Sequence, residues 1–131
     1  MIILAIISTT SFYTTNRLYN DIRTLIDTYP FLQLESIGNS VLGNPIPVIR
    51  IGRGQKQVFY SASIHANESI TTNVLLKFIE DFCVSYTNNS TIYGINARNI
   101  FNNTSIYIVP MCNPDGVNLV NGYFETRKCY I

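Results

Sequence analysis

Apolar residues at three- and four-residue spacing predict two long helices. The first covers residues 16–29, before Pro30, and its cap is one of Thr14, Thr15 and Asn16. The same spacing returns over residues 69–86. Such amphipathic patterns are typical of helices that cover a core. Glu80 and Asp81 fall on the other side of the second helix, and we expect that face to be solvated.

Period-two alternation and β-branched residues predict strands between these helices. Residues 31–37 alternate apolar and polar side chains, and residues 46–51 follow after turn-forming glycines. Residues 58–64 are β-branched and aromatic at first and small later, which predicts a buried strand. A further strand is predicted over residues 105–110, after a short helix over residues 95–101.

This order of elements predicts an α/β fold with a mixed, mainly parallel sheet and flanking helices. Strands at 58–64 and 105–110, separated by a long helix, suit a parallel βαβ unit. The segment 32–51 suits an antiparallel edge of the same sheet. We expect residues 1–12 to form an apolar start, either strand or disordered, before one folded unit over residues 13–131.

Composition narrows the function classes. Hydrophobic residues make up 47% of the 131 residues and charged residues 13%, so a packed core is expected and intrinsic disorder is excluded. The net charge of +1 gives no electrostatic footprint for nucleic acid. The cysteines Cys83, Cys112 and Cys129 form no metal-binding or disulfide pattern, and we expect reduced, structural thiols.

The apolar start of the chain predicts neither a membrane span nor a signal peptide. Residues 1–7 are far shorter than the roughly 20 residues that span a bilayer. A signal peptide begins with a positive charge, but the first cation here is Arg17.

The only histidine stands where an α/β sheet places its ligands. His65 follows the predicted strand 58–64, and Glu68 lies three residues later, before the predicted helix. An imidazole nitrogen and a carboxylate oxygen at this spacing on a turn can converge on one cation, and zinc accepts such donors. On its own, this signal is weak, because a solitary histidine is more often a hydrogen-bonded structural residue and a carboxylate three positions later is common by chance.

A second motif follows the predicted strand 105–110. Asn113-Pro114-Asp115-Gly116 has the residue types of a tight turn, and by itself it indicates only that. Both motifs, however, stand at the carboxyl end of a predicted strand, with one helix-bearing crossover between them.

Taken together, the stretches 63–72, 76–82 and 107–117 resemble the carboxypeptidase A-like zinc metallopeptidases. Within that family they are most similar to the bacterial γ-D-glutamyl-L-diamino acid endopeptidases, which cut cell-wall peptides. Residues 29–32 and 36–43 resemble the family's amino-terminal segment. The resemblance implies that residues 13–131 are the amino-terminal part of a metallopeptidase catalytic domain, with a partial carboxypeptidase-like α/β/α fold. The localisation stays open between the bacterial cytoplasm and the cell envelope.

The resemblance also implies roles for individual residues. It makes His65 and Glu68 two of the family's three protein ligands for Zn²⁺, and it places Asn67 where relatives carry a substrate-facing residue. The alternative for Asn67 is a hydrogen bond to the backbone of the turn. Residues 113–116 become a structural turn beside the active-site cleft. Ser69 departs from the pattern, since many relatives have tryptophan there.

The resemblance further implies that the sequence holds only part of the site. In the family, a second ligand histidine and a catalytic glutamate lie downstream of the 113–116 turn, and this chain has no second histidine. Arg127 fits a carboxylate clamp or, as the bland alternative, a solvated charge. A third zinc ligand is open in principle to any of Cys112, Asp115 and Cys129.

The expected function is therefore hydrolysis of peptide bonds by a zinc metallopeptidase, with γ-D-glutamyl-diamino acid bonds of peptidoglycan stem peptides as substrate. As a truncated chain, the polypeptide is expected to be inactive alone. We also expect self-association, because segments that cover the central strands in the family are not in the sequence. The alternative is a non-catalytic α/β module that binds a peptide or partner chain, with His65 and Glu68 as remnants.

Overall fold

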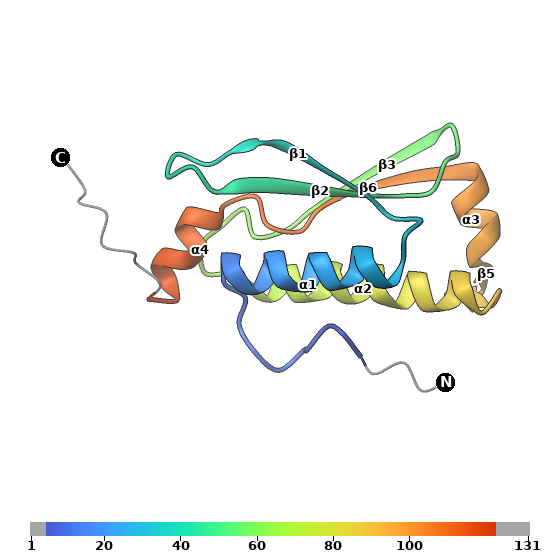
Figure 1. The fold of residues 1–131 in the computed structure, drawn as a ribbon, viewed down its shortest axis with the longest axis horizontal. Helices are drawn as coiled ribbons and strands as arrows, with labels where there is room; N and C mark the ends of the chain where they lie inside the picture. The colour runs from blue at the N-terminus through green and yellow to red at the C-terminus, as the bar shows by residue number, and fades with distance from the viewer. Residues whose placement is uncertain (1–4, 123–131) are drawn as a thin grey trace.

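The computed structural model describes residues 5–122, and within them the chain forms a four-stranded sheet, a small two-stranded sheet and four helices (Figure 1). The elements follow the order predicted from the hydrophobic pattern. They are α1 (Thr15–Thr28), β1 (Gln33–Asn39), β2 (Pro45–Ile51), β3 (Lys56–Ser61), α2 (Ile70–Thr87), β4 (Thr91–Ile92), β5 (Ile95–Asn96), α3 (Ala97–Asn103), β6 (Thr104–Val109) and α4 (Pro114–Val120).

The larger sheet is mixed, as predicted, with the strand order β1-β2-β6-β3. β3 and β6 are parallel, and their register pairs Val58 with Ile106 and Ser61 with Val109. The β1–β2 and β2–β6 pairings are antiparallel, so two of the three pairings of this sheet within residues 5–122 are antiparallel rather than parallel. Because β3 and β6 run the same way, the segments that follow them leave the same edge of the sheet.

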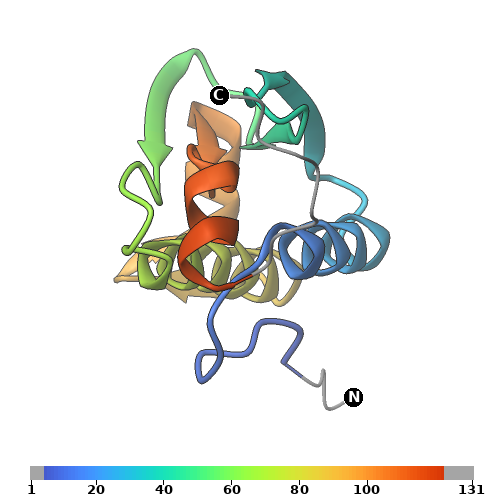
Figure 2. The same ribbon diagram turned by 90° about the vertical axis from the view of Figure 1, so that its left-hand side faces the viewer.

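The core lies between the sheet and helices α1 and α2, which run side by side below it in Figure 1 and cover one face of it in Figure 2. The predicted α1 is confirmed: the Thr14 side chain caps it by accepting from the backbone N–H of Arg17. Burial of each large aliphatic side chain in this layer contributes about 1.5–3 kcal/mol. Fully buried members come from four elements: Leu18, Leu25, Ile49, Ile51, Leu76, Ile79 and Ile108.

The strand predicted over residues 58–64 is not buried, which corrects the expectation from its composition. β3 ends at Ser61, and all six of its residues are exposed. Within residues 5–122 it is an edge strand, paired on one side with β6 alone, so Phe59 remains 62% exposed. The apolar residues of β3 therefore belong to an exposed strand, one side of which has no neighbouring strand within residues 5–122.

The prediction of a solvated face at Glu80 is also wrong, because the amino-terminal segment covers that side of α2. Glu80 is 2% exposed, accepts from the backbone N–H of Ile6 and pairs with Lys77 at 2.9 Å. Asn73, two turns earlier on the same face of α2, donates to two carbonyls of the same segment at 3.1 Å each. Residues 5–12 contain neither helix nor strand.

Side-chain hydrogen bonds join the start of α1 to α4 and the residue that follows it. The Asn118 side chain accepts from the backbone N–H of Thr15 at 3.1 Å and donates to its hydroxyl at 2.9 Å. The Asn121 side chain donates to the carbonyl of Tyr13 at 2.9 Å. α4 is thereby held against the start of α1. No helix within residues 5–122 has the length and hydropathy needed to cross a bilayer.

Candidate functional site

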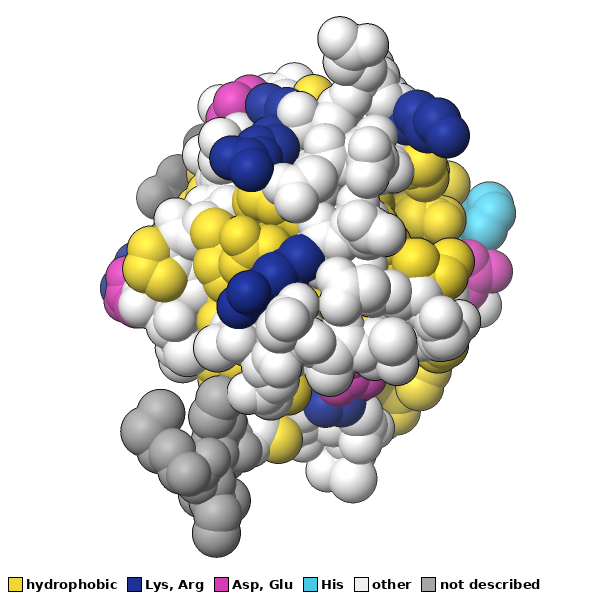
Figure 3. Space-filling model, turned by 90° about the vertical axis from the view of Figure 1, so that its right-hand side faces the viewer, with side chains coloured by type: hydrophobic (Ala, Val, Ile, Leu, Met, Phe, Trp, Pro, Cys, Tyr) yellow, Lys and Arg dark blue, Asp and Glu magenta, His cyan; other side chains and the backbone are white. Residues whose placement is uncertain are grey.

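His65 and Glu68 lie on the turn between β3 and α2, as the sequence predicted. The backbone N–H of Glu68 donates to the carbonyl of His65 at 3.1 Å, which closes the turn and puts the two side chains on one loop. Both side chains are exposed, and the single histidine, cyan in Figure 3, stands out from the surface. Among residues 5–122, neither side chain has a hydrogen bond or ion pair, so both remain available as donors to a cation.

A network of hydroxyl groups fixes the backbone beneath this turn. Ser63 adopts a left-handed conformation with φ of 48°, which costs a non-glycine residue on the order of 1 kcal/mol. Its N–H donates to the Thr71 hydroxyl at 2.8 Å, and its own hydroxyl lies 2.7 Å from that of Thr72. Thr72 donates to the Pro110 carbonyl at 2.6 Å, while Thr71 donates to the Glu68 carbonyl at 2.8 Å. These bonds tie the turn to both α2 and the end of β6.

The segment after β6 begins a helix instead of forming the isolated tight turn predicted from its sequence. Asn113 is the cap of α4, because its side-chain oxygen accepts from the N–H of Gly116 at 2.9 Å, and Pro114 is the first helical residue. The Asn113 N–H donates to the Ser63 carbonyl at 3.0 Å. The two motifs therefore lie together at one edge of the sheet, as their positions after parallel strands indicated.

The carboxylate of Asp115 is hydrogen-bonded to the loop between β1 and β2. It accepts from the Ser40 hydroxyl at 2.6 Å, from the Asn44 amide at 2.7 Å and from the Leu42 N–H at 3.0 Å. Burial alone would raise the pKa of this carboxyl, but these hydrogen bonds outweigh it and lower the pKa below its ordinary 3.8. Asp115 thus holds the loop, a contact that no local sequence signal indicated, because its partners are about 70 residues away.

The remaining candidates for a third zinc ligand do not complete a site within residues 5–122. No group of three or more histidine, cysteine, aspartate or glutamate side chains gathers there. Cys83 is buried, and burial, followed by the nearby Glu80 carboxylate, raises the pKa of its thiol. Cys112 is a half-buried free thiol. Cys129 and Arg127 lie outside the described residues.

Asn67 and Ser69 flank Glu68 in different environments. Asn67 is exposed, and within residues 5–122 its side chain makes no hydrogen bond to the turn, contrary to the backbone-bonding alternative. Ser69 is 5% exposed at the start of α2, where it provides no side-chain cap. Ser69 is therefore a small, packed residue. Asn67 is exposed to solvent, as His65 and Glu68 are.

The donor chemistry of the turn suits zinc as a partial site. Zinc is held in proteins by imidazole nitrogen and carboxylate oxygen, and His65 and Glu68 offer one of each from a backbone that is fixed by hydrogen bonds. Two donors leave a zinc ion open to further ligands. The described residues therefore offer two donors of the types that zinc accepts.

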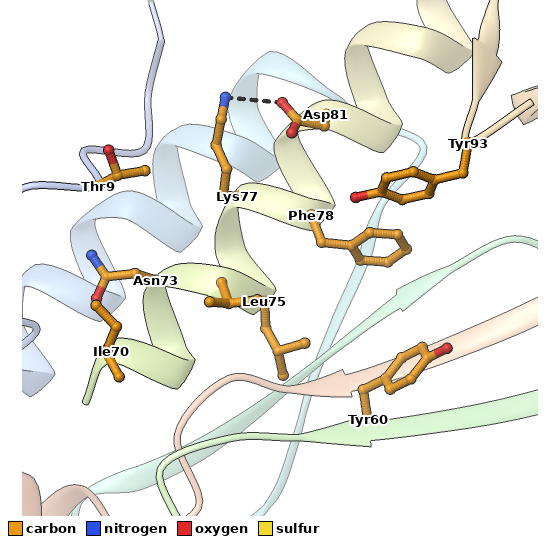
Figure 4. Close-up of a pocket in the computed structure, with 10 residues that line it drawn as sticks. Thr9, Tyr60, Ile70, Asn73, Leu75, Lys77, Phe78, Asp81 and Tyr93 are labelled. Atoms are coloured by element: carbon orange, nitrogen blue, oxygen red, sulfur yellow. Dashed lines mark ion pairs between the residues drawn. The ribbon is translucent and has the colours of Figure 1, made fainter. Parts of the chain in front are cut away.

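An apolar groove of about 540 Å³ lies elsewhere, between β3 and α2 (Figure 4). The ring of Tyr60 packs edge-on against that of Phe78, with centroids 6.2 Å apart, and Tyr93 lies at the far end. Lys77 and Asp81 form an ion pair of 2.9 Å at its rim. The sequence did not predict this groove, because apolar residues at helical spacing in α2 are expected in the buried core, whereas several of them line the groove. His65 and Glu68 are not among its lining residues.

Comparison with known proteins gives concordant matches in sequence and structure. Residues 18–129 match the zinc carboxypeptidase family. The chain is 50% identical over 108 residues to γ-D-glutamyl-L-diamino acid endopeptidase 1 of Lysinibacillus sphaericus, a match that covers 82% of this chain and 27% of that protein. It is 34% identical to carboxypeptidase E of Caenorhabditis elegans, over 75% of this chain and 21% of that protein.

The fold is shared with solved carboxypeptidases. Carboxypeptidase A of Helicoverpa armigera superposes with a TM-score of 0.73 at 20% identity, over 93% of this chain and 30% of that one. Thrombin-activatable fibrinolysis inhibitor superposes with a TM-score of 0.72 at 22% identity, over 85% of this chain and 28% of that one. The chain spans 27% and 29% of the length of the two bacterial relatives that it matches at 50% and 44% identity.

The contacts of Asp115 predict a pH-dependent contribution to stability. We expect Asp115→Asn to lower the free energy of unfolding at pH 7 by about 1–2 kcal/mol, since hydrogen bonds to a charged acceptor are lost. The native pKa is lowered, so the carboxylate stabilises the fold above its ordinary pKa and loses this effect as the pH falls through the native value, below 3.8.

Urea denaturation at pH 7 and near pH 3 measures the difference, which should shrink in acid. Asp27→Asn is the matched control, because Asp27 is exposed on α1 and should give almost no change at either pH. An equal loss for Asp115→Asn at both pH values would contradict the assignment.

Proposed function

The chain belongs to the zinc carboxypeptidase family, and from that premise we propose that His65 and Glu68 are two protein ligands of a catalytic zinc ion. The observation that carries the proposal is the turn itself: an imidazole and a carboxylate, both exposed and unbonded within residues 5–122, stand on one backbone loop at the carboxyl edge of the sheet. Ligands of α/β enzymes lie at this edge.

The proposed reaction is hydrolysis of a peptide bond. Zinc bound at such a site supplies an acidified water and polarises the scissile carbonyl. His65 contributes a neutral donor and Glu68 a negative one. The hydroxyl network through Ser63, Thr71 and Thr72 fixes the backbone of the turn, so little backbone reorganisation accompanies binding.

For the substrate, we propose a γ-D-glutamyl-diamino acid bond in a peptidoglycan stem peptide. Support comes from the 50% identity to a bacterial endopeptidase named for that bond. We propose that Asn67 faces this substrate: it is exposed between the two ligands, and its amide has a free donor and a free acceptor within the described part of the chain.

A binding module without catalysis is the second candidate, favoured by the groove between β3 and α2. This groove is lined by aromatic and aliphatic side chains and excludes His65 and Glu68. In that case a peptide or partner chain binds through β3 and α2, and the histidine is dispensable. Unchanged folding and partner binding after His65→Ala would favour this candidate.

We also propose that the isolated chain self-associates through β3. An edge strand with unpaired N–H and C=O groups and exposed apolar side chains is a template for pairing with another chain. β3 exposes Phe59 and Tyr60 together, and its single charge is Lys56 at the start. The chain offers little charge near the middle of this strand to oppose pairing.

Zinc binding is the direct test of the metal proposal. The single imidazole gives one set of histidine resonances, so a Zn²⁺ titration followed by NMR reports on His65 alone. We expect saturable shifts in the wild-type chain and an affinity at least about tenfold lower in Glu68→Gln. Glu35→Gln, on exposed β1, is the matched control and should bind as the wild type does. Equal affinities in all three proteins would overturn the proposal.

The 131-residue polypeptide alone should hydrolyse γ-D-glutamyl-diamino acid peptides no faster than the blank, even with added Zn²⁺. It carries one histidine, and its described residues bring together two metal donors rather than three. A steady-state assay measures this directly. Robust turnover that disappears in His65→Ala would show that the polypeptide has a complete site.

Sedimentation velocity tests the self-association. We expect the wild-type chain to form dimers or larger species as its concentration rises, and Phe59→Lys to move the distribution toward monomer, since a charge at the centre of an edge strand opposes pairing. Val41→Lys adds the same charge at a loop residue that is 99% exposed, and should leave the distribution unchanged. A monodisperse wild-type monomer at high concentration would contradict the proposal.

A further inference from the structure

We propose that Asn113 and Gly116, at the start of α4, are positioning residues that hold the His65–Glu68 turn in the geometry that binds metal. The inference rests on the proposed zinc site, and it assigns a role to two residues that touch neither the metal nor the substrate. It arises from the contacts between α4 and the turn, which join segments about 50 residues apart in sequence.

Asn113 bonds to the turn and to its own helix at the same time. Its side-chain N–H donates to the Ile64 carbonyl at 3.3 Å, and its backbone N–H donates to the Ser63 carbonyl at 3.0 Å. Its side-chain oxygen accepts from Gly116 at 2.9 Å. The two residues immediately before His65 are therefore fixed to the first turn of α4.

Gly116 lets the helix approach the turn closely. A Cβ atom at this position would lie 2.9 Å from the Cβ of Ala66, which stands between His65 and Asn67. It would also lie 2.5 Å and 2.8 Å from the side-chain nitrogen and oxygen of Asn113. Alanine is the better helix former, so close packing, rather than helix propensity, accounts for glycine here. Any side chain at this position pushes on the Asn113 side chain and on the turn.

The start of α4 is itself anchored on its other side. Asp115, between the two positioning residues, holds the loop between β1 and β2 through Ser40, Asn44 and Leu42. The turn is thus supported by a short helix that is bonded to the β1–β2 loop, at the same edge of the sheet.

The exposed side chains of the turn make this support matter for metal binding. His65 and Glu68 have no hydrogen bonds of their own within residues 5–122, so the backbone of the turn determines where their donor atoms lie. Donor placement to within about half an ångström decides how well a site binds. Loosening of this backbone should therefore weaken zinc binding before it lowers the stability of the whole fold.

Asn113→Ser separates positioning from helix capping. Serine caps a helix as well as asparagine does, but its shorter side chain does not reach the Ile64 carbonyl. Asn96→Ser is the matched control: Asn96 caps α3 through Arg98 and Asn99, and its side-chain N–H makes a similarly long hydrogen bond, to Asn89 at 3.3 Å. Gly116→Ala is the second variant, which tests the close approach.

The expected result is a three- to tenfold lower Zn²⁺ affinity in Asn113→Ser and in Gly116→Ala, read from the His65 imidazole resonances of the full chain. Asn96→Ser should bind as the wild type does. Amide hydrogen exchange without metal gives the second readout: the Glu68 N–H, bonded to the His65 carbonyl, should exchange several times faster in Asn113→Ser, with α1 and α2 unchanged.

The outcomes separate the two proposals. A wild-type imidazole that does not respond to Zn²⁺ overturns the proposed function, while faster Glu68 exchange in Asn113→Ser still supports the positioning role. Wild-type affinity and exchange in both Asn113→Ser and Gly116→Ala overturn the inference. Faster exchange throughout α1 and α2 also overturns it, because it marks a residue that only stabilises the fold.

Discussion

The parallel pairing of β3 with β6 is the constraint on which the site depends. Parallel strands end at the same edge of a sheet, so the residues that follow β3 and those that follow β6 meet there. One strand leads into Ser63 and His65 and the other into Asn113. An antiparallel pairing would place these segments at opposite edges. The hydrogen bonds between Ser63, Thr72 and Pro110 then fix a proximity that the topology has already created.

The helices and the meeting of the two motifs could be predicted from the sequence because their signals are local. Apolar spacing defines α1 and α2, and the position of each motif after a strand defines the edge. The exposure of β3 could not be predicted, since a run of apolar residues looks the same in the sequence of a central strand and of an edge strand. The contacts of Glu80 and Asp115 could not be predicted for another reason. Their hydrogen-bond partners, Ile6 and Ser40, lie 74 and 75 residues away in the sequence.

The candidate site shows how chemistry and support are divided along this chain. The turn carries the two proposed metal donors, exposed and without partners of their own in the described residues. Its backbone is held by hydrogen bonds to the hydroxyl groups of α2 beneath it and to Asn113, the cap of α4, beside it. In the proposed zinc site, this combination would leave coordination positions open for the reaction while the backbone that carries the protein ligands stays fixed. The apolar groove between β3 and α2 is a separate surface with a different chemistry.

The hydrogen bonds between α4 and the start of α1 have a consequence for biosynthesis. Asn118 and Asn121 bond to Thr15 and Tyr13, so the pairs are separated by more than 100 residues. A chain emerging from the ribosome can form α1 early, but these contacts, and those of Asn113 with the turn, must wait until α4 has been made. Contacts of such long range slow folding, because a large loop has to close first. The His65–Glu68 turn is thus among the last parts of the described chain to acquire its final shape during translation.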